Sequence, residues 1–185
     1  ADFRDEGPVR AMVHRVADHF GRIDALVTCA VIRHAVALEE VTADDLRIHF
    51  DVTCVGTFVA AQEAGAVMVR QPDGGGIVTV GDWEVARPRA GFAAAMPSLG
   101  ALPAMTRSLA VEWAARNPRV RVNCVLAGVA AVPAEADAMA SAARAAPLVS
   151  RSGTPEHLAH AVLFLLENDF VTGVCLPVDG GRTIA

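Results

Sequence analysis

The residue best placed for chemistry is an aspartate that directly follows a short apolar run typical of a buried strand. Asp82 would then lie at the carboxyl end of a parallel strand, where open α/β sheets place their sites. An apolar crevice would raise the pKa of this carboxyl group and suit it to general-base catalysis, with His34 as a partner and Trp83 as a stacking wall. The alternative, which we favour, is a structural carboxylate at a helix cap or turn, paired with Arg87 or Arg89.

Other reactive side chains are scarce or scattered. The chain contains no tyrosine, and all 16 of its Lys and Arg residues are arginines. Its cysteines form no C-x-x-C pair, and we interpret them as buried, reduced thiols. They are Cys29, Cys54, Cys124 and Cys175. His157 and His160 could share a helical face, but no third ligand is near in sequence, so we predict no metal site.

Length and composition indicate one globular domain over residues 1–185. The chain is 53% hydrophobic and 20% charged, which is enough for a sizeable core and excludes a disordered polymer. The net charge of −5 and the scattered arginines argue against nucleic-acid binding. No apolar run is long enough to span a bilayer, and the opening ADFRDEGPVR is unlike a signal peptide. We therefore expect a cytoplasmic protein without membrane contact.

Strand and helix patterns alternate along the chain. We predict helices over 6–20, 42–70, 98–115 and 154–167, with a further helical excursion over 130–146. We predict buried strands over 25–32, 77–80, 120–126 and 174–178. This order is typical of right-handed βαβ units, and it predicts a doubly wound parallel α/β sheet of at least four strands in sequential order. Pro103 lacks a backbone N–H, so we expect it to disturb the start of the third helix.

Short motifs recur in a fixed order over nearly the whole chain. They are FGRIDALV at 20–27, GTF at 56–58, TRSLAVE at 106–112, RVN at 121–123, VTG at 171–173 and VDGG at 178–181. In this order they resemble the short-chain dehydrogenase/reductase family, in particular its bacterial β-ketoacyl reductase branch. The resemblance implies a Rossmann-like fold and, in an intact member, an NAD(P)-dependent oxidoreductase.

The positions that resemble the family's catalytic tetrad carry other residues here. In the family, an Asn holds a proton-relay water, a Ser hydrogen-bonds the substrate carbonyl, a Tyr exchanges the proton and a Lys grips the nicotinamide ribose. The matching positions in this chain are Thr53, Asp82, Ala95 and Leu99. The resemblance therefore implies a degenerate member without catalytic residues, in which only Asp82 remains a candidate.

The positions that resemble the family's cofactor site are changed as well. The strand motif Asn-Asn-Ala-Gly reads TCAV at 28–31, so Val31 would fill space beside the adenosine. Val132 takes the place of the Thr that binds the nicotinamide carboxamide. The first three strands and the Gly-rich phosphate turn are missing from this chain, and the glycines at 74–76 precede a strand, the wrong order for phosphate binding. We expect no bound cofactor, and either residues before Ala1 in the gene product or a partner over the exposed edge strand.

Three hypotheses for the function stay open. The first is a non-catalytic subunit that supports an active NAD(P)-dependent relative acting on β-hydroxyacyl or β-ketoacyl substrates, with a homodimer as fallback. It draws on a surplus of small and apolar residues in the helices at 42–70 and 98–115, the helices through which family members associate. These residues include Ala60, Ala61, Ala64, Ala66, Ala101, Ala104 and Leu109. The second hypothesis is a cofactor-independent isomerase, cyclase or lyase that uses Asp82, and the third is an atypical NAD(P)-dependent oxidoreductase.

Overall fold

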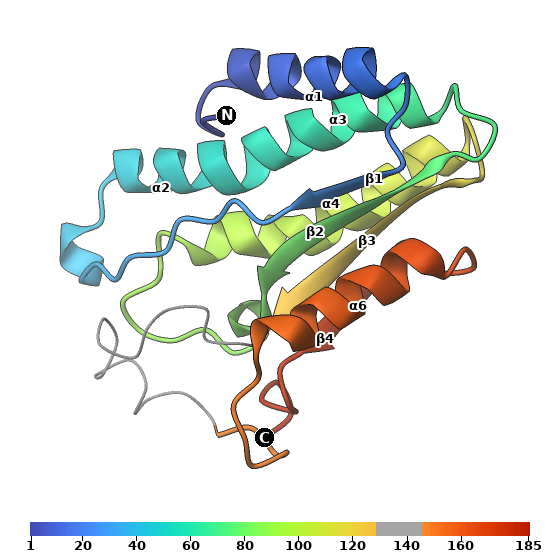
Figure 1. Cartoon of the computed structure of the whole chain (residues 1–185). Coiled ribbons are helices and arrows are strands. Elements are labelled where there is room, and N and C mark those ends of the chain that lie inside the picture. The colour runs from blue at the N-terminus through green and yellow to red at the C-terminus, as the bar shows by residue number, and fades with distance from the viewer. Residues whose placement is uncertain (129–145) are drawn as a thin grey trace.

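A parallel four-stranded sheet forms the centre of the molecule (Figure 1). The computed structural model describes residues 1–128 and 146–185. The strands are β1 (Ala25–Thr28), β2 (Gly75–Asp82), β3 (Val120–Ala127) and β4 (Cys175–Val178), and they pair in the order β1-β2-β3-β4. This confirms the predicted parallel α/β sheet in sequential order. The helical excursion predicted over 130–146 falls almost entirely outside the described residues.

Helices cover both faces of this sheet (Figure 1). They are α1 (Glu6–Phe20), α2 (Ala43–His49), α3 (Gly56–Met68), α4 (Met96–Ala114) and α6 (Pro155–Glu167). Alternate strand residues point to opposite faces. Ile77 and Val122 therefore pack in the cluster shared with α1, α3 and α4, whereas Val78 and Val125 pack against Leu165 of α6. None of these helices is long and apolar enough to cross a membrane.

Local capping residues set the ends of the helices that the sequence predicts best. The side chain of Asp5 accepts a hydrogen bond from the Gly7 amide at the start of α1, and Gly21 ends this helix with φ of 74°. Thr154 and His157 form a reciprocal capping box at the start of α6. The predicted bounds of these two helices are confirmed because their signals lie within a few residues of each end.

The helix predicted over 42–70 has an irregular middle. A π-helical segment, η2 (Phe50–Val55), lies between α2 and α3, so the helical path is continuous but its hydrogen-bond pattern changes around Thr53. Such single π-helical turns are common at functional sites. Hydrophobic periodicity cannot reveal this change, because the segment still winds as a helix.

The helix at 98–115 differs from its prediction. The disturbance expected at Pro103 is wrong: α4 begins at Met96 and runs without a break to Ala114. The missing N–H of an interior proline costs about 3 kcal/mol. Tertiary packing offsets this cost, because the turn that precedes Pro103 is held in the core: Leu99 and Leu102 are at most 1% exposed.

The strand predicted over 25–32 is shorter than expected. The ladder to β2 ends at Thr28, and the chain then leaves the sheet as an extended segment. The apolar residues beyond Thr28 do not extend the strand. Val31 packs instead against Leu99 and its neighbours.

The sequence suggested that the small residues of α3 form surplus apolar surface, but most of them are buried. Ala60, Ala61 and Ala64 are 0% exposed, and Leu109 of α4 is 6% exposed. Ala61, Ala64 and Leu109 lie in the cluster between the helices and the sheet. Their small side chains allow the helices to approach closely, so they belong to the core of one subunit.

Candidate functional site

An apolar cluster occupies the positions that resemble the family's Tyr and Lys. Ala95 and Leu99 are both 0% exposed and lie in one cluster with Leu102. Val31 packs against the same cluster from the segment that follows β1. The side chains that the resemblance places beside the substrate and the cofactor therefore pack together in an apolar cluster.

Thr53, at the position that resembles the family's Asn, is also enclosed. It lies in η2, which packs against α4, and it is 0% exposed. Its Oγ1 atom has no hydrogen-bond partner within residues 1–128 and 146–185. His49, four residues earlier, is equally buried, and its Nδ1 lies 2.6 Å from the Asp45 carbonyl oxygen.

Asp82 caps a short turn at the carboxyl end of β2. It accepts a hydrogen bond of 2.8 Å from the Glu84 amide and begins the 3-10 helix η3 (Trp83–Val85). The cap that the favoured interpretation expected is present. Arg33 is an ion-pair partner of Asp82, and its guanidinium contacts both Asp82 and Glu84. Arg87, one of the two predicted partners, instead donates to the Arg182 carbonyl oxygen at 3.3 Å.

Arg33 and Asp82 belong to a larger group of side chains, which we call the ionic cluster. It consists of the charged residues Arg33, Asp82, Glu84 and Arg89 and the ring of Phe92, on which both arginines lie. Arg89 bonds the Glu84 carboxylate at 3.1 Å, and Glu84 is 1% exposed. Both guanidinium groups lie over the Phe92 ring, at 5.0 Å and 4.0 Å from its centroid. Asp82 therefore lies among charged side chains and not in the apolar crevice that the sequence suggested.

Sequence reasoning did not identify Arg33 or Glu84. Arg33 lies 49 residues from Asp82 in the sequence. The available signal was topological: each residue follows a strand, and β1 and β2 are neighbours in the sheet, so the chain beyond both strands starts at the same edge. This topology brings the two segments to the same edge, but it does not specify which of their side chains meet.

The other candidates around Asp82 have partners of their own. His34 stacks against His49 with ring centroids 5.0 Å apart, and its Nε2 lies 4.0 Å from an Asp45 carboxylate oxygen. The structure thus places His34 against α2. Trp83 is 5% exposed, with the Arg182 guanidinium 5.8 Å from its ring centroid, so it is a core residue rather than an open stacking wall.

The described part of the chain offers no cluster of metal ligands, and its cysteines are less buried than the sequence suggested. Within it, no three His, Cys, Asp or Glu side chains gather in a way that could hold a metal ion. The four cysteines are free thiols, but only Cys124 is buried, and Cys29 is exposed. Cys29 is exposed because it follows the last paired residue of β1, an edge strand. Val132, the position that resembles the carboxamide-binding Thr, lies outside the described residues.

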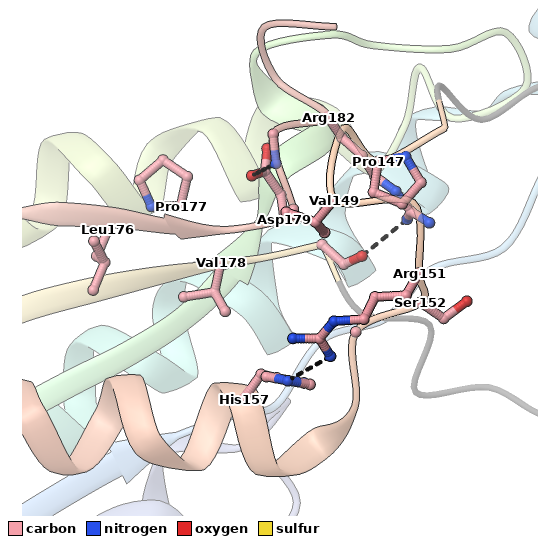
Figure 2. Close-up of a pocket in the computed structure, with 14 residues that line it drawn as sticks. Pro147, Val149, Arg151, Ser152, His157, Leu176, Pro177, Val178, Asp179 and Arg182 are labelled. Atoms are coloured by element: carbon pink, nitrogen blue, oxygen red, sulfur yellow. Dashed lines mark hydrogen bonds between the residues drawn. The ribbon is translucent and has the colours of Figure 1, made fainter.

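A separate cavity of about 380 Å³ opens at the carboxyl ends of β3 and β4 (Figure 2). Its polar lining comes mainly from Arg151, His157, Asp179 and Arg182. None of the four tetrad positions lines it. The VDGG motif at 178–181 and His157 both line this cavity, but the sequence did not show that they meet, because the walls come from three separate parts of the chain.

Comparison with known proteins identifies the family. A sequence model described as "Enoyl-(Acyl carrier protein) reductase" matches residues 1–183. Carbonyl reductase family member 4 of Xenopus tropicalis is 33% identical over 184 residues, which cover 97% of this chain and 75% of that protein. The (2S)-[(R)-hydroxy(phenyl)methyl]succinyl-CoA dehydrogenase subunit BbsD of Thauera aromatica is 33% identical over 194 residues, which cover 100% of this chain and 75% of that protein.

The fold agrees with these sequence matches. The ligand-free aldohexose dehydrogenase of Thermoplasma acidophilum superposes with a TM-score of 0.89 at 26% identity, covering 100% of this chain and 77% of that chain. This chain therefore spans about three quarters of the length of its relatives. Matches over nearly the whole chain, together with the sequential parallel sheet, show that the chain belongs to the short-chain dehydrogenase/reductase family.

Proposed function

We propose that this chain is a non-catalytic subunit that assembles with an active NAD(P)-dependent member of its family and supports it. The observation that carries the proposal is the apolar cluster at Ala95 and Leu99, both 0% exposed. A proton donor at the first position and a cation at the second would need a polar, open crevice. The chain offers neither the side chains nor the space for them.

The same cluster does not fit a nicotinamide cofactor. Val31, at the position that would fill space beside the adenosine, packs against the group that contains Leu99, at the position of the Lys that grips the nicotinamide ribose. Asp82, at the substrate-binding Ser position, is held by Arg33. The active partner would therefore bring the cofactor and the catalytic residues, and this chain would stabilise the assembly or shape the substrate entrance.

Exposed apolar side chains on two helices support an assembling role. Val55 and Phe58, at the junction of η2 and α3, are 46% and 41% exposed, and Val111 of α4 is 71% exposed. These side chains are the apolar groups that a partner chain could cover on the two helices through which family members associate. A homodimer is the fallback if no active relative binds.

The names of the relatives support the substrate class of the proposed partner. The family model is described as an enoyl-(acyl carrier protein) reductase, whose name refers to an acyl thioester carrier, and BbsD of Thauera aromatica is named as a subunit of a succinyl-CoA derivative's dehydrogenase. A β-hydroxyacyl or β-ketoacyl thioester is therefore the substrate that we propose for the assembly. The cytoplasm is the compartment that we propose for it.

The second candidate, a cofactor-independent enzyme based on Asp82, has less support. One oxygen of its carboxylate accepts a hydrogen bond from the Glu84 amide and the other contacts the Arg33 guanidinium, so both oxygens already have donors. The atypical NAD(P)-dependent oxidoreductase has less support still, because the apolar side chains of Val31 and Leu99 stand at positions where the family leaves room for the cofactor or holds it.

Co-purification from the native host tests the proposal directly. We expect a tagged chain to retain a family member that contains the Tyr and Lys, and turnover of the pair should exceed that of either chain alone. Calorimetry of the isolated chain with NAD(H) and NADP(H) should show no appreciable binding. A dissociation constant in the low micromolar range, or dehydrogenase activity of the isolated chain, would contradict a non-catalytic role.

A further inference from the structure

We propose that the cavity at the ends of β3 and β4 is a binding site for a small carboxylate with an apolar body. This assignment does not depend on the proposed function, because the cavity is lined by none of the tetrad positions and by no residue of the ionic cluster. Open parallel sheets bind ligands beyond the carboxyl ends of their strands, and this cavity lies there. Its volume of about 380 Å³ falls within the range for small-molecule sites.

The cavity is lined by both apolar and cationic side chains (Figure 2). The apolar ones belong to Pro147, Val149, Leu176, Pro177 and Val178. Arg151, His157 and Arg182 supply nitrogen atoms. This mixture suits a ligand with an anionic head and a hydrocarbon part.

Two hydrogen-bond donors face each other at the rim of the cavity (Figure 2). The Thr154 backbone N–H points at His157 Nδ1 from 2.9 Å, so Nδ1 must accept, and in the neutral ring the proton is then on Nε2. Arg151 Nη1, which can only donate, lies 3.0 Å from this Nε2. Two N–H groups at that separation repel, so neither nitrogen satisfies the other. A carboxylate bound beside the pair could accept a hydrogen bond from each of them.

Arg182 adds a second cation at the inner end of the cavity. Its Nη1 donates to the Gly128 carbonyl oxygen at 2.9 Å, which fixes the guanidinium in place. Its Nε is buried and has no acceptor among the described residues, and with almost no exposed surface it is not available to a ligand in the cavity. Arg182 therefore contributes to the site through its positive charge.

The lining also contains one carboxylate, Asp179, which offsets one of the two guanidinium charges. Burial alone would raise the pKa of Asp179, but hydrogen bonds from the Thr183 hydroxyl, the Thr183 amide and the Gly181 amide outweigh it and lower the pKa, so the carboxyl group stays ionised near neutral pH. These three donors surround the Asp179 oxygens and turn them toward the chain's own C-terminal turn. Two guanidinium groups against one carboxylate leave a net positive lining, which favours a ligand with a single negative charge.

Hexanoate is a suitable probe for this site, with 1-hexanol as its neutral match. We expect the full chain to bind hexanoate with a dissociation constant of about 1 mM or tighter, a value ordinary for a ligand of this size. Methyl signals of Val149 and Val178 should shift in NMR spectra during the titration. 1-Hexanol should bind at least tenfold more weakly, because it cannot satisfy the two facing donors with a charge.

Three variants test which groups hold the head. Arg151→Gln should weaken hexanoate binding at least tenfold without affecting the fold, since this side chain is at the surface. His157→Gln removes the ring Nε2 while keeping a side chain able to form the capping box with Thr154, and it should weaken binding at least threefold. Arg70→Gln, at an exposed arginine after α3, is the matched control and should leave binding unchanged.

Several results would overturn this assignment. They are no hexanoate binding at 10-fold the expected constant, about 10 mM, equal binding of hexanoate and 1-hexanol, and unchanged affinity in Arg151→Gln. Methyl shifts confined to residues outside the cavity would overturn it as well.

Discussion

Arg33 links the segment after β1 to the end of β2. Its guanidinium contacts the Asp82 and Glu84 carboxylates and lies 5.0 Å from the Phe92 ring centroid. Taking several charges out of water is costly, and such a group is stable only when each charge keeps its partner. The ionic cluster therefore acts as a structural unit in which the loss of one cation affects two carboxylates.

Replacing Arg33 tests this role. Arg33→Met should lower the free energy of unfolding by about 2–4 kcal/mol, because two largely buried carboxylates lose a shared cation. Arg47→Met is the matched control, since Arg47 pairs with Asp44 at side chains that are 70% and 88% exposed. It should change stability by less than about 0.5 kcal/mol. Urea denaturation of both variants gives the comparison, and equal losses would contradict the cluster's structural role.

Asp82→Asn separates the proposed function from its second candidate. The amide oxygen of asparagine can still accept the Glu84 N–H, so the turn at η3 should persist. In the assembly with its active partner, turnover should stay within about twofold, because no transition-state interaction is lost. A drop of about a hundredfold with assembly intact, about 2.7 kcal/mol of barrier, would instead identify Asp82 as a catalytic group.

Cys175 should be the most reactive thiol near neutral pH. It lies opposite Cys124 in the register of β3 and β4. A hydrogen bond from the Cys124 thiol, together with the charge of Arg107, lowers the pKa of Cys175 to about 7 against the opposing effect of burial. Burial raises the pKa of Cys54. Only the thiolate reacts with alkylating agents, so the two sites should differ in rate.

Iodoacetamide labelling followed by mass spectrometry measures this difference. The labelling rate of Cys175 should rise through a midpoint near pH 7, whereas the rate of Cys54 should rise only at higher pH. In Cys124→Ala, the Cys175 midpoint should move upward, because the thiolate loses its donor. A midpoint that is unchanged in this variant would show that Cys124 does not set the Cys175 pKa.

At the scale of elements, predictions from the sequence were right where the signals are local. Asp5 and Gly21 sit at the ends of α1, and Thr154 caps α6, so both helices could be located from a few neighbouring residues. The end of β1 and the continuity of α4 depend on distant packing. Val31 leaves the sheet to pack against the Leu99 cluster, and Pro103 stays in a helix held by the same cluster.

Two helical glycines distinguish packing from helix propensity. A side chain added at Gly65 of α3 would overlap the Trp113 indole of α4, whereas nothing lies within 4 Å of one added at Gly100. Alanine is favoured over glycine in a helix by about 1 kcal/mol. Gly100→Ala should therefore stabilise the protein by up to that amount, while Gly65→Ala should destabilise it by about 1–3 kcal/mol through overpacking. Thermal unfolding of the two variants checks the opposite signs.

At the scale of the whole molecule, the sequence revealed which residues occupy the family positions but not what surrounds them. Thr53, Asp82, Ala95 and Leu99 could be matched from neighbouring motifs. The ionic cluster and the separate cavity join segments that are far apart in sequence, so no local pattern reveals them. Whether α3 alanines face the core or another subunit also depends on the angle at which helices pack, and Ala61 proved to be core.

This burial changes the variant that best tests assembly. Ala61→Glu would put a charge into the core between α3 and the sheet, so loss of soluble protein would report misfolding and not a broken interface. Val111 is 71% exposed and lies on α4, where its replacement leaves the core of the subunit intact. Val16 of α1 is also apolar and is 41% exposed, so it serves as a control outside the two proposed contact helices.

Val111→Glu should abolish assembly and leave a folded, soluble monomer. An interface strong enough to persist at micromolar concentration buries more than about 1,200 Å² in total, and a charge placed inside it without a partner is strongly unfavourable. Val16→Glu should keep the oligomeric state of the unchanged protein. Light scattering after size-exclusion chromatography measures both, with circular dichroism as the check on folding. If the unchanged chain is monomeric both alone and in a host lysate that contains its candidate partners, it has no stable interface, and the proposed supporting role is excluded.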